Sequence, residues 1–149
     1  MNDARLPATR ECHATALRKA ARRVTALYDE TLAPSGLRST QSAILAELVD
    51  RGQDPPTLNE LADLLVLDRS GLGHSLRPLE REGLIQLEKS SRDRRSTLVV
   101  ITDQGRERYA HAHALWQKAQ DRYASIVGEA QANQLRQHLL EIGHGDQLA

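Results

Sequence analysis

The chain has 149 residues, of which 40% are hydrophobic and 27% are charged, proportions that are ordinary for a globular domain with a core of its own. Its 20 basic residues balance its 20 acidic residues, and this argues mildly against nucleic-acid binding unless the basic residues are clustered. The apolar stretches are too short to span a bilayer, residues 1–10 lack a signal-peptide core, and the single cysteine, Cys12, excludes an internal disulfide. We therefore expect a cytoplasmic protein.

Two helices are predicted before residue 53. The first runs from about Ala8 to Ala33 and ends at Pro34–Gly36, whose residues cannot easily continue a helix. Ser39 is the expected N-cap of the second helix, which ends near Gly52. Three- and four-residue spacing in the first helix predicts one buried apolar stripe. This stripe consists of Leu17, Ala21, Val24, Tyr28 and Leu32.

Two shorter helices follow a loop. Thr57 and Glu60 have the spacing of a capping box, so a helix is expected to start at Thr57. Asp68 is a good N-cap for the next helix, and Gly83 suits its C′ position. Pro78 inside that helix removes a backbone hydrogen bond, so we expect a bend or an irregular last turn.

The next segment is predicted to be a β-hairpin with a basic turn. The strands are Leu84–Lys89 and Ser96–Ile101, and the turn Ser90–Arg95 between them is rich in arginine. Thr102 then caps a long helix that Gly128 interrupts before a last helix. An a/d-type stripe in the long helix favours packing along another helix. It consists of Tyr109, Ala112, Trp116, Ala119, Tyr123 and Ile126.

The order of these elements predicts a mainly α fold with a small β-hairpin wing, namely a winged helix-turn-helix with helical dimerisation extensions. We assign residues 1–36 and 103–149 to dimerisation and residues 37–102 to DNA binding. The helix that starts at Asp68 is expected to enter the major groove by its N-terminal end. Its candidate DNA-binding residues are Arg69, Ser70, Gly71, His74 and Arg77.

The turn of the hairpin supplies the second candidate DNA contact. An arginine on such a turn is attracted by a narrow minor groove, and Arg92, Arg94 and Arg95 are the candidates. Asp93 lies among them and is expected to hold Arg95 or Arg94 in position through a charge-assisted hydrogen bond.

The runs LDRSGLGHSLRPLEREGLI (Leu67–Ile85) and SSRDRRSTLVVITDQG (Ser90–Gly105) resemble the multiple-antibiotic-resistance regulator (MarR) family. The resemblance implies that Arg95 is the minor-groove residue and Asp93 its positioner, through the family's Asp-x-Arg signature. It also implies a homodimer formed by the first and last helices. Small phenolic or lipophilic effectors would bind between these helices and the winged domain. The candidate ligand residues are His13, Leu17, Gln41, Leu45 and His111.

The hypothesis is therefore a MarR-type transcriptional regulator, a repressor that an effector releases from a pseudo-palindromic operator. One alternative is a winged-helix protein-interaction module without DNA binding. Another is a redox sensor using Cys12, although the peroxide sensors of the family have their cysteine where this chain has Ala14. A metal sensor would need His111 and His113 on one helix face, which their spacing disfavours.

The sequence gives no sign of an enzyme. It has no glycine-rich phosphate loop, no nucleophile motif and no metal-ligand spacing, so we expect neither a cofactor nor a bound metal. The aromatic residues Tyr109, Trp116 and Tyr123 could line a ligand pocket, but packing in the core or the dimer is the favoured interpretation.

Overall fold

A computed structural model of the protein describes residues 10–145 and residue 148. The described part is mainly helical and contains one antiparallel hairpin, as the sequence predicts. In chain order the elements are α1 (His13–Leu32), the 3-10 turn η2 (Ala33–Ser35), α2 (Ser39–Arg51), α3 (Leu58–Leu65), α4 (Arg69–Arg81), β1 (Ile85–Lys89), β2 (Thr97–Ile101), α5 (Asp103–Val127) and α6 (Glu129–His144).

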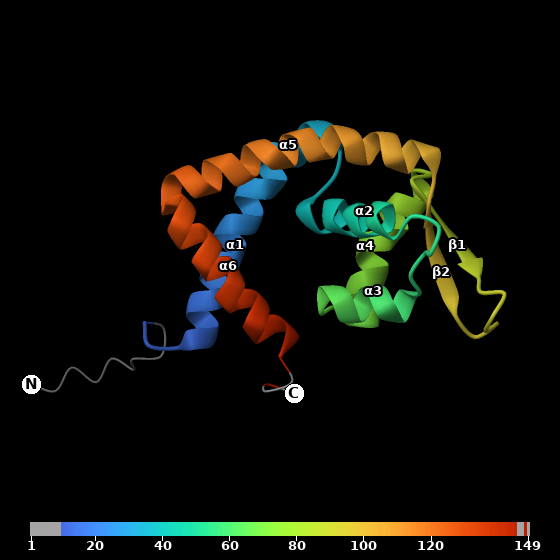
Figure 1. Ribbon diagram of the computed structural model, residues 1–149, viewed down its shortest axis with the longest axis horizontal. Coiled ribbons are helices and arrows are strands. Elements are labelled where there is room, and N and C mark those ends of the chain that lie inside the picture. Colours follow the sequence, from blue (N-terminus) through green and yellow to red (C-terminus); the bar gives the residue numbers. More distant parts are fainter. Residues whose placement is uncertain (1–9, 146–147, 149) are drawn as a thin grey trace, which may run out of the picture.

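The long helix α5 connects two parts of the molecule (Figure 1). Helices α2, α3 and α4 and the hairpin lie beneath its N-terminal half, whereas α1 and α6 lie beneath its C-terminal half. No helix within residues 10–145 is both long enough and apolar enough to cross a membrane. The arrangement separates a compact winged-helix part from a pair of projecting helices.

Side-chain caps start three of the helices where the sequence predicts them. The Thr57 hydroxyl accepts the Glu60 amide at 3.1 Å, and the Glu60 carboxylate accepts the Thr57 amide at 3.2 Å. Asp68 caps α4, and Thr102 caps α5. Each cap satisfies a backbone N–H that the first turn of a helix leaves without a partner.

The prediction that Ser39 caps α2 is wrong. The N-cap is Arg38, whose N–H donates to the Gln41 side chain at 3.0 Å. Ser39 is already helical, and its N–H donates to the Asp29 carboxylate at 2.7 Å. The Asp29 side chain of α1 therefore accepts an amide at the start of α2, where the sequence had predicted a local cap by Ser39.

Helix α4 continues through Pro78 and ends in a glycine motif. Gly83 adopts a φ of 73°, which is in the left-handed region that favours glycine. The Gly83 N–H donates to the Glu80 carbonyl at 3.0 Å, and the Leu84 N–H donates to the Leu79 carbonyl at 2.9 Å. This pair of bonds is a Schellman motif, and it confirms Gly83 at the C′ position.

The apolar stripe of α1 is only partly buried by its own chain. Its expected start at Ala8 lies outside the described residues, and the described helix begins at His13. Leu32 is fully buried, but Leu17 is 45% exposed and Ala21 is also exposed. Among the described residues, the N-terminal half of the stripe is therefore left largely exposed.

The base of the hairpin is fixed to the core. Ile85 pairs with Ile101, and the Val99 N–H donates to the Pro56 carbonyl at 2.9 Å in the loop before α3. Ile85 and Val99 are buried among leucines of the helices, whereas the turn of the hairpin is exposed. The sheet thus has an anchored base and a free tip.

The first turn of α5 lies directly against the start of the hairpin. The Thr102 hydroxyl donates to the Gly83 carbonyl at 2.6 Å, and the Thr102 N–H donates to the Leu84 carbonyl at 3.1 Å. A Cβ atom at Gly105 would lie 2.1 Å from the Leu84 carbonyl oxygen. Only glycine allows this approach, so the contact joins α5 closely to the winged-helix part.

Candidate functional site

Helix α4 presents a polar face to solvent. Leu72, Leu76 and Leu79 are buried against the core. The side chains on the opposite face are exposed and recur at three- and four-residue steps. They are Arg69, Ser70, His74 and Arg77.

The two glycines of α4 have different surroundings. The Gly71 N–H donates to Asp68 Oδ1 at 2.6 Å, and a Cβ atom at Gly71 would lie 3.0 Å from the same oxygen. Gly71 therefore belongs to the helix cap. A Cβ atom at Gly73 would meet only the Arg77 guanidinium, at 3.9 Å. Gly73 is the residue that sequence reasoning missed, and its position four residues before Arg77 was the available signal.

Asp93 organises the turn of the hairpin through the backbone. Its Oδ1 accepts the Arg95 N–H at 3.0 Å, and its Oδ2 accepts the Ser96 hydroxyl at 3.3 Å. Within the described residues Asp93 makes no ion pair with Arg94 or Arg95. The expected charge-assisted hydrogen bond from Asp93 to Arg95 is therefore present, and its donor is the Arg95 backbone N–H. The guanidinium groups project into solvent.

The five candidate DNA-binding arginines of α4 and the turn make this side of the winged-helix part positively charged. All five are exposed, and none forms an ion pair within the part of the chain that the structure describes. Unpaired guanidinium groups can bind phosphate oxygens or base edges. The five are Arg69, Arg77, Arg92, Arg94 and Arg95.

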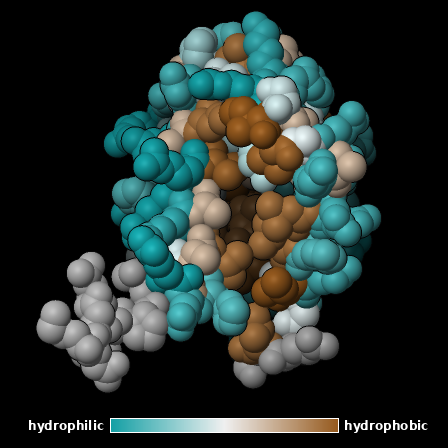
Figure 2. Space-filling model, turned by 90° about the vertical axis from the view of Figure 1, so that its left-hand side faces the viewer, coloured by the Kyte–Doolittle hydropathy of each residue, from teal (hydrophilic) through white to brown (hydrophobic). Residues whose placement is uncertain are grey.

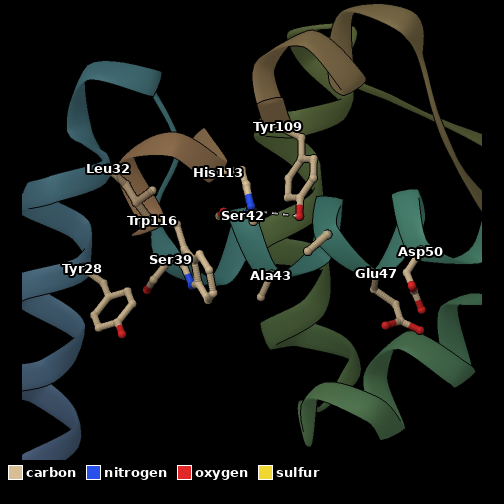
Figure 3. A pocket seen from close by; sticks show the side chains of 11 residues that line it. Tyr28, Leu32, Ser39, Ser42, Ala43, Glu47, Asp50, Tyr109, His113 and Trp116 are labelled. Atoms are coloured by element: carbon tan, nitrogen blue, oxygen red, sulfur yellow. Dashed lines mark hydrogen bonds between the residues drawn. The ribbon is translucent and has the colours of Figure 1, made fainter. Parts of the chain in front are cut away.

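A second candidate site is a cavity of about 500 Å³ between α1, α2 and α5, here called the central cavity (Figure 3). Aromatic side chains and two carboxylates contribute to its wall. The Tyr109 hydroxyl lies 3.4 Å from His113 Nδ1, and the His113 and Trp116 rings stack with centroids 5.3 Å apart. The lining residues are Tyr28, Leu32, Ser39, Ser42, Ala43, Ala46, Glu47, Asp50, Tyr109, His113 and Trp116.

The five candidate ligand residues do not come together. Leu45 is fully buried in the core, and the Gln41 side chain accepts the Arg38 N–H. His13 and Leu17 are exposed on α1, and His111 lies in a shallow pocket between α5 and the segment that joins α4 to β1. None of them lines the central cavity.

Two of the residues that line the central cavity belong to a stripe that the sequence analysis had assigned to packing. Tyr109 and Trp116 belong to the aromatic stripe of α5, for which packing was the favoured interpretation. The sequence could not show that α1 and α2 leave a hollow beside these rings.

Tyr28 belongs to two cavities. Besides the central cavity, it lines an apolar groove of about 310 Å³ between α1, α5 and α6. Its hydroxyl donates to the Gln120 side chain, and burial raises the pKa of this hydroxyl above its ordinary value. The ring is thus a wall shared by the two cavities.

Of the alternative sensor residues, Cys12 and His111 line neither cavity, whereas His113 is part of the wall of the central cavity. Cys12 is half-buried at the start of α1, and Thr15 lowers the pKa of the Cys12 thiol through hydrogen bonds from its hydroxyl and amide. Among the residues that the structure describes, no three His, Cys, Asp or Glu side chains are grouped so that they could hold a metal ion.

Comparison with known proteins relates the chain to transcriptional regulators. The sequence profile of the MarR family matches residues 35–96. The structure is similar to M. tuberculosis MosR in complex with DNA, with 29% identity, a TM-score of 0.80, and coverage of 93% of this chain and 98% of that chain. It is also similar to the repressor CouR bound to a 23-mer DNA duplex, with 28% identity, a TM-score of 0.78, and coverage of 95% and 99%.

A further similar structure is CouR from Rhodococcus jostii RHA1 bound to p-coumaroyl-CoA, with 22% identity, a TM-score of 0.77, and coverage of 93% and 96%. At this identity the likeness concerns the fold alone. No curated protein matches the sequence. Together these similarities confirm the winged helix-turn-helix class, and the similar proteins are regulators rather than enzymes.

Proposed function

Because residues 35–96 form a MarR-family domain and the whole chain has the fold of MarR-type transcriptional regulators, we propose that this protein is a cytoplasmic, DNA-binding repressor. It acts as a homodimer on a pseudo-palindromic operator, and a small effector releases it. The observation that carries the proposal is that the five candidate arginines of α4 and the turn of the hairpin are exposed and form no ion pair with any described residue. The DNA-bound MosR and CouR structures support the same reading.

In this proposal α4 enters the major groove by its N-terminal half. Ser70 and Gly73 are small, so the helix backbone can approach the base edges, and Arg77 can donate two parallel hydrogen bonds to a guanine. His74 can donate to a neighbouring base, and Arg69 lies at the helix start, where it can reach a phosphate.

The turn of the hairpin binds the adjacent minor groove. Arg95 enters it because the narrow groove concentrates negative potential, while Arg92 and Arg94 bind the flanking phosphates. Asp93 fixes the backbone at Arg95, so less conformational entropy is lost when the guanidinium binds.

The homodimer is supported by an apolar surface on the projecting helices. Figure 2 shows hydrophobic residues lining a hollow along this side of the molecule. Helix-borne leucines, isoleucines and valines would remain in water if the chain were alone, and a second copy would cover them. The exposed apolar residues are Leu17, Ile126, Val127, Leu135, Leu139, Leu140 and Ile142.

The salt dependence of binding to duplex DNA tests the proposed function against a winged-helix protein-interaction module. Each phosphate that the protein neutralises contributes about −0.9 to the slope of log K against log salt. Three arginines on each protomer, Arg69, Arg92 and Arg94, are assigned to phosphates, so a dimer neutralises about six phosphates and we expect a slope of about −5. Fluorescence anisotropy with a labelled duplex measures it, and absence of binding even at low salt would exclude a DNA-binding role.

The Leu139→Glu variant tests the homodimer. Leu139 is 40% exposed and lines the groove between α1, α5 and α6, so a carboxylate there would lose its hydration when the dimer forms. We expect the wild-type protein to sediment as a dimer and Leu139→Glu to sediment as a monomer. Leu64→Glu is the matched control, because Leu64 on α3 is also 40% exposed but lies outside the groove. A dimeric Leu139→Glu protein would show that the interface lies elsewhere.

A further inference from the structure

The central cavity combines aromatic rings with negative charge. We propose that it binds an aromatic cation, such as an aromatic amine protonated at neutral pH, as the effector of this regulator. The inference rests on the proposed function for its regulatory consequence. The binding chemistry itself follows from the lining residues.

The aromatic part of the wall comes from α1 and α5. The rings of His113 and Trp116 are stacked with an interplanar angle of 16°, and Tyr109 lies beside His113 with a centroid distance of 5.7 Å. Tyr28 contributes a further ring from α1. Aromatic ligands pack favourably against such rings, and the negative face of a tryptophan or tyrosine ring attracts a cation.

The charged part of the wall is acidic. Glu47 and Asp50 on α2 line the cavity, and Figure 3 shows them together at one end of the row of lining side chains, with Tyr28 at the other end. No lysine or arginine is among the described residues that line it. A ligand with a ring at one end and an ammonium group at the other matches this arrangement.

The two carboxylates differ in how far they are already neutralised. Glu47 Oε1 accepts a hydrogen bond from Arg51 Nε at 3.1 Å, so part of its charge is compensated from outside the cavity. Asp50 has no hydrogen-bond or ion-pair partner among the described residues. Asp50 is therefore the carboxylate that an incoming cation would pair with.

The described residues that line this cavity offer an anionic ligand neutral hydroxyl and indole donors but no lysine or arginine. The positive end of α2 lies at Ser39, but the Ser39 N–H already donates to Asp29 at 2.7 Å. A carboxylate or phosphate would also be repelled by Glu47 and Asp50. The charge distribution thus discriminates between ligands of similar shape.

Two probes of similar size and opposite charge test the inference: 2-phenylethylammonium and 3-phenylpropanoate. Trp116 is the only tryptophan and lines the cavity, so its fluorescence reports occupancy in the full-length protein without DNA. We expect the ammonium probe to bind about tenfold more tightly than the carboxylate probe, an advantage typical of a cation paired with one partly exposed carboxylate and a ring face.

The Asp50→Asn variant should bind the ammonium probe about fivefold more weakly and the carboxylate probe no more weakly. Asp54→Asn is the matched control, because Asp54 is an exposed aspartate just beyond α2 that does not line the cavity. Equal binding of the two probes, binding of neither, or an equal effect of both variants would overturn the inference. A gel shift of the same preparation, without either probe, separates the two proposals. If the wild-type protein bound no duplex, that result would count against the proposed function and not against the ligand preference.

Discussion

The Arg95→Ala variant should bind its preferred duplex about 100-fold more weakly than the wild-type protein. Arg95 is exposed, its backbone is fixed by Asp93, and its guanidinium has no ion-pair partner within the described residues. An arginine that reads a groove contributes about 1–3 kcal/mol, and a dimer loses two of them. Gel shift measures the affinity, and sedimentation should show an intact dimer.

Arg122→Ala provides the comparison for this loss. Arg122 is an exposed arginine on α5, far along the helix from the hairpin, and its replacement removes the same charge. We expect its affinity for DNA to change by no more than about twofold, because unspecific long-range charge effects are screened at physiological salt. If Arg95→Ala behaved like Arg122→Ala, the turn of the hairpin would have no part in DNA recognition.

The Gly105→Ala variant should lower the free energy of unfolding by about 2–3 kcal/mol, the upper range for overpacking by a single methyl group. A Cβ atom there would lie 2.1 Å from the Leu84 carbonyl oxygen and 2.7 Å from Ile101 Cγ1. Because the nearer atom belongs to the backbone, relief requires that α5 move away from β1. Urea denaturation followed by circular dichroism measures the change, at one fixed protein concentration because the protein is proposed to be a dimer.

Gly143→Ala is the matched glycine variant. Gly143 lies in α6 with nothing within 4 Å of its potential Cβ atom, so alanine should stabilise that helix slightly through its higher helix propensity. Equal stability of Gly105→Ala and the wild-type protein would show that the junction of α5 and the hairpin is loosely packed. That result would remove the close coupling between the long helix and the winged-helix part.

Local chemistry was enough to predict most helix starts, the hairpin and the fold class. Thr57, Asp68 and Thr102 act as caps because each hydroxyl or carboxylate bonds an amide only three residues away. Ser39 failed as a prediction because Asp29, ten residues earlier, supplies the contact from another helix. Helix-cap rules that consider only residues a few positions away cannot predict contacts from another helix.

The candidate sites show the same division. The exposed face of α4 follows from helical periodicity, so Arg69 and Arg77 could be selected from the sequence. The central cavity could not, because it depends on how α1, α2 and α5 separate around the ring of Trp116. Periodicity also grouped Leu17 with Leu32 on one stripe, but it could not tell that the described residues bury Leu32 and leave Leu17 exposed.

The double position of Tyr28 has a thermodynamic consequence. Its ring separates the central cavity, proposed for the effector, from the groove proposed for the second protomer. An effector that displaces the ring therefore alters the surface on which the subunits meet, so effector binding and dimerisation become linked. Linkage is reciprocal, so dimerisation must change the apparent affinity for the effector by the same factor by which the effector changes the subunit dissociation constant. The apparent affinity for the effector should therefore vary with protein concentration.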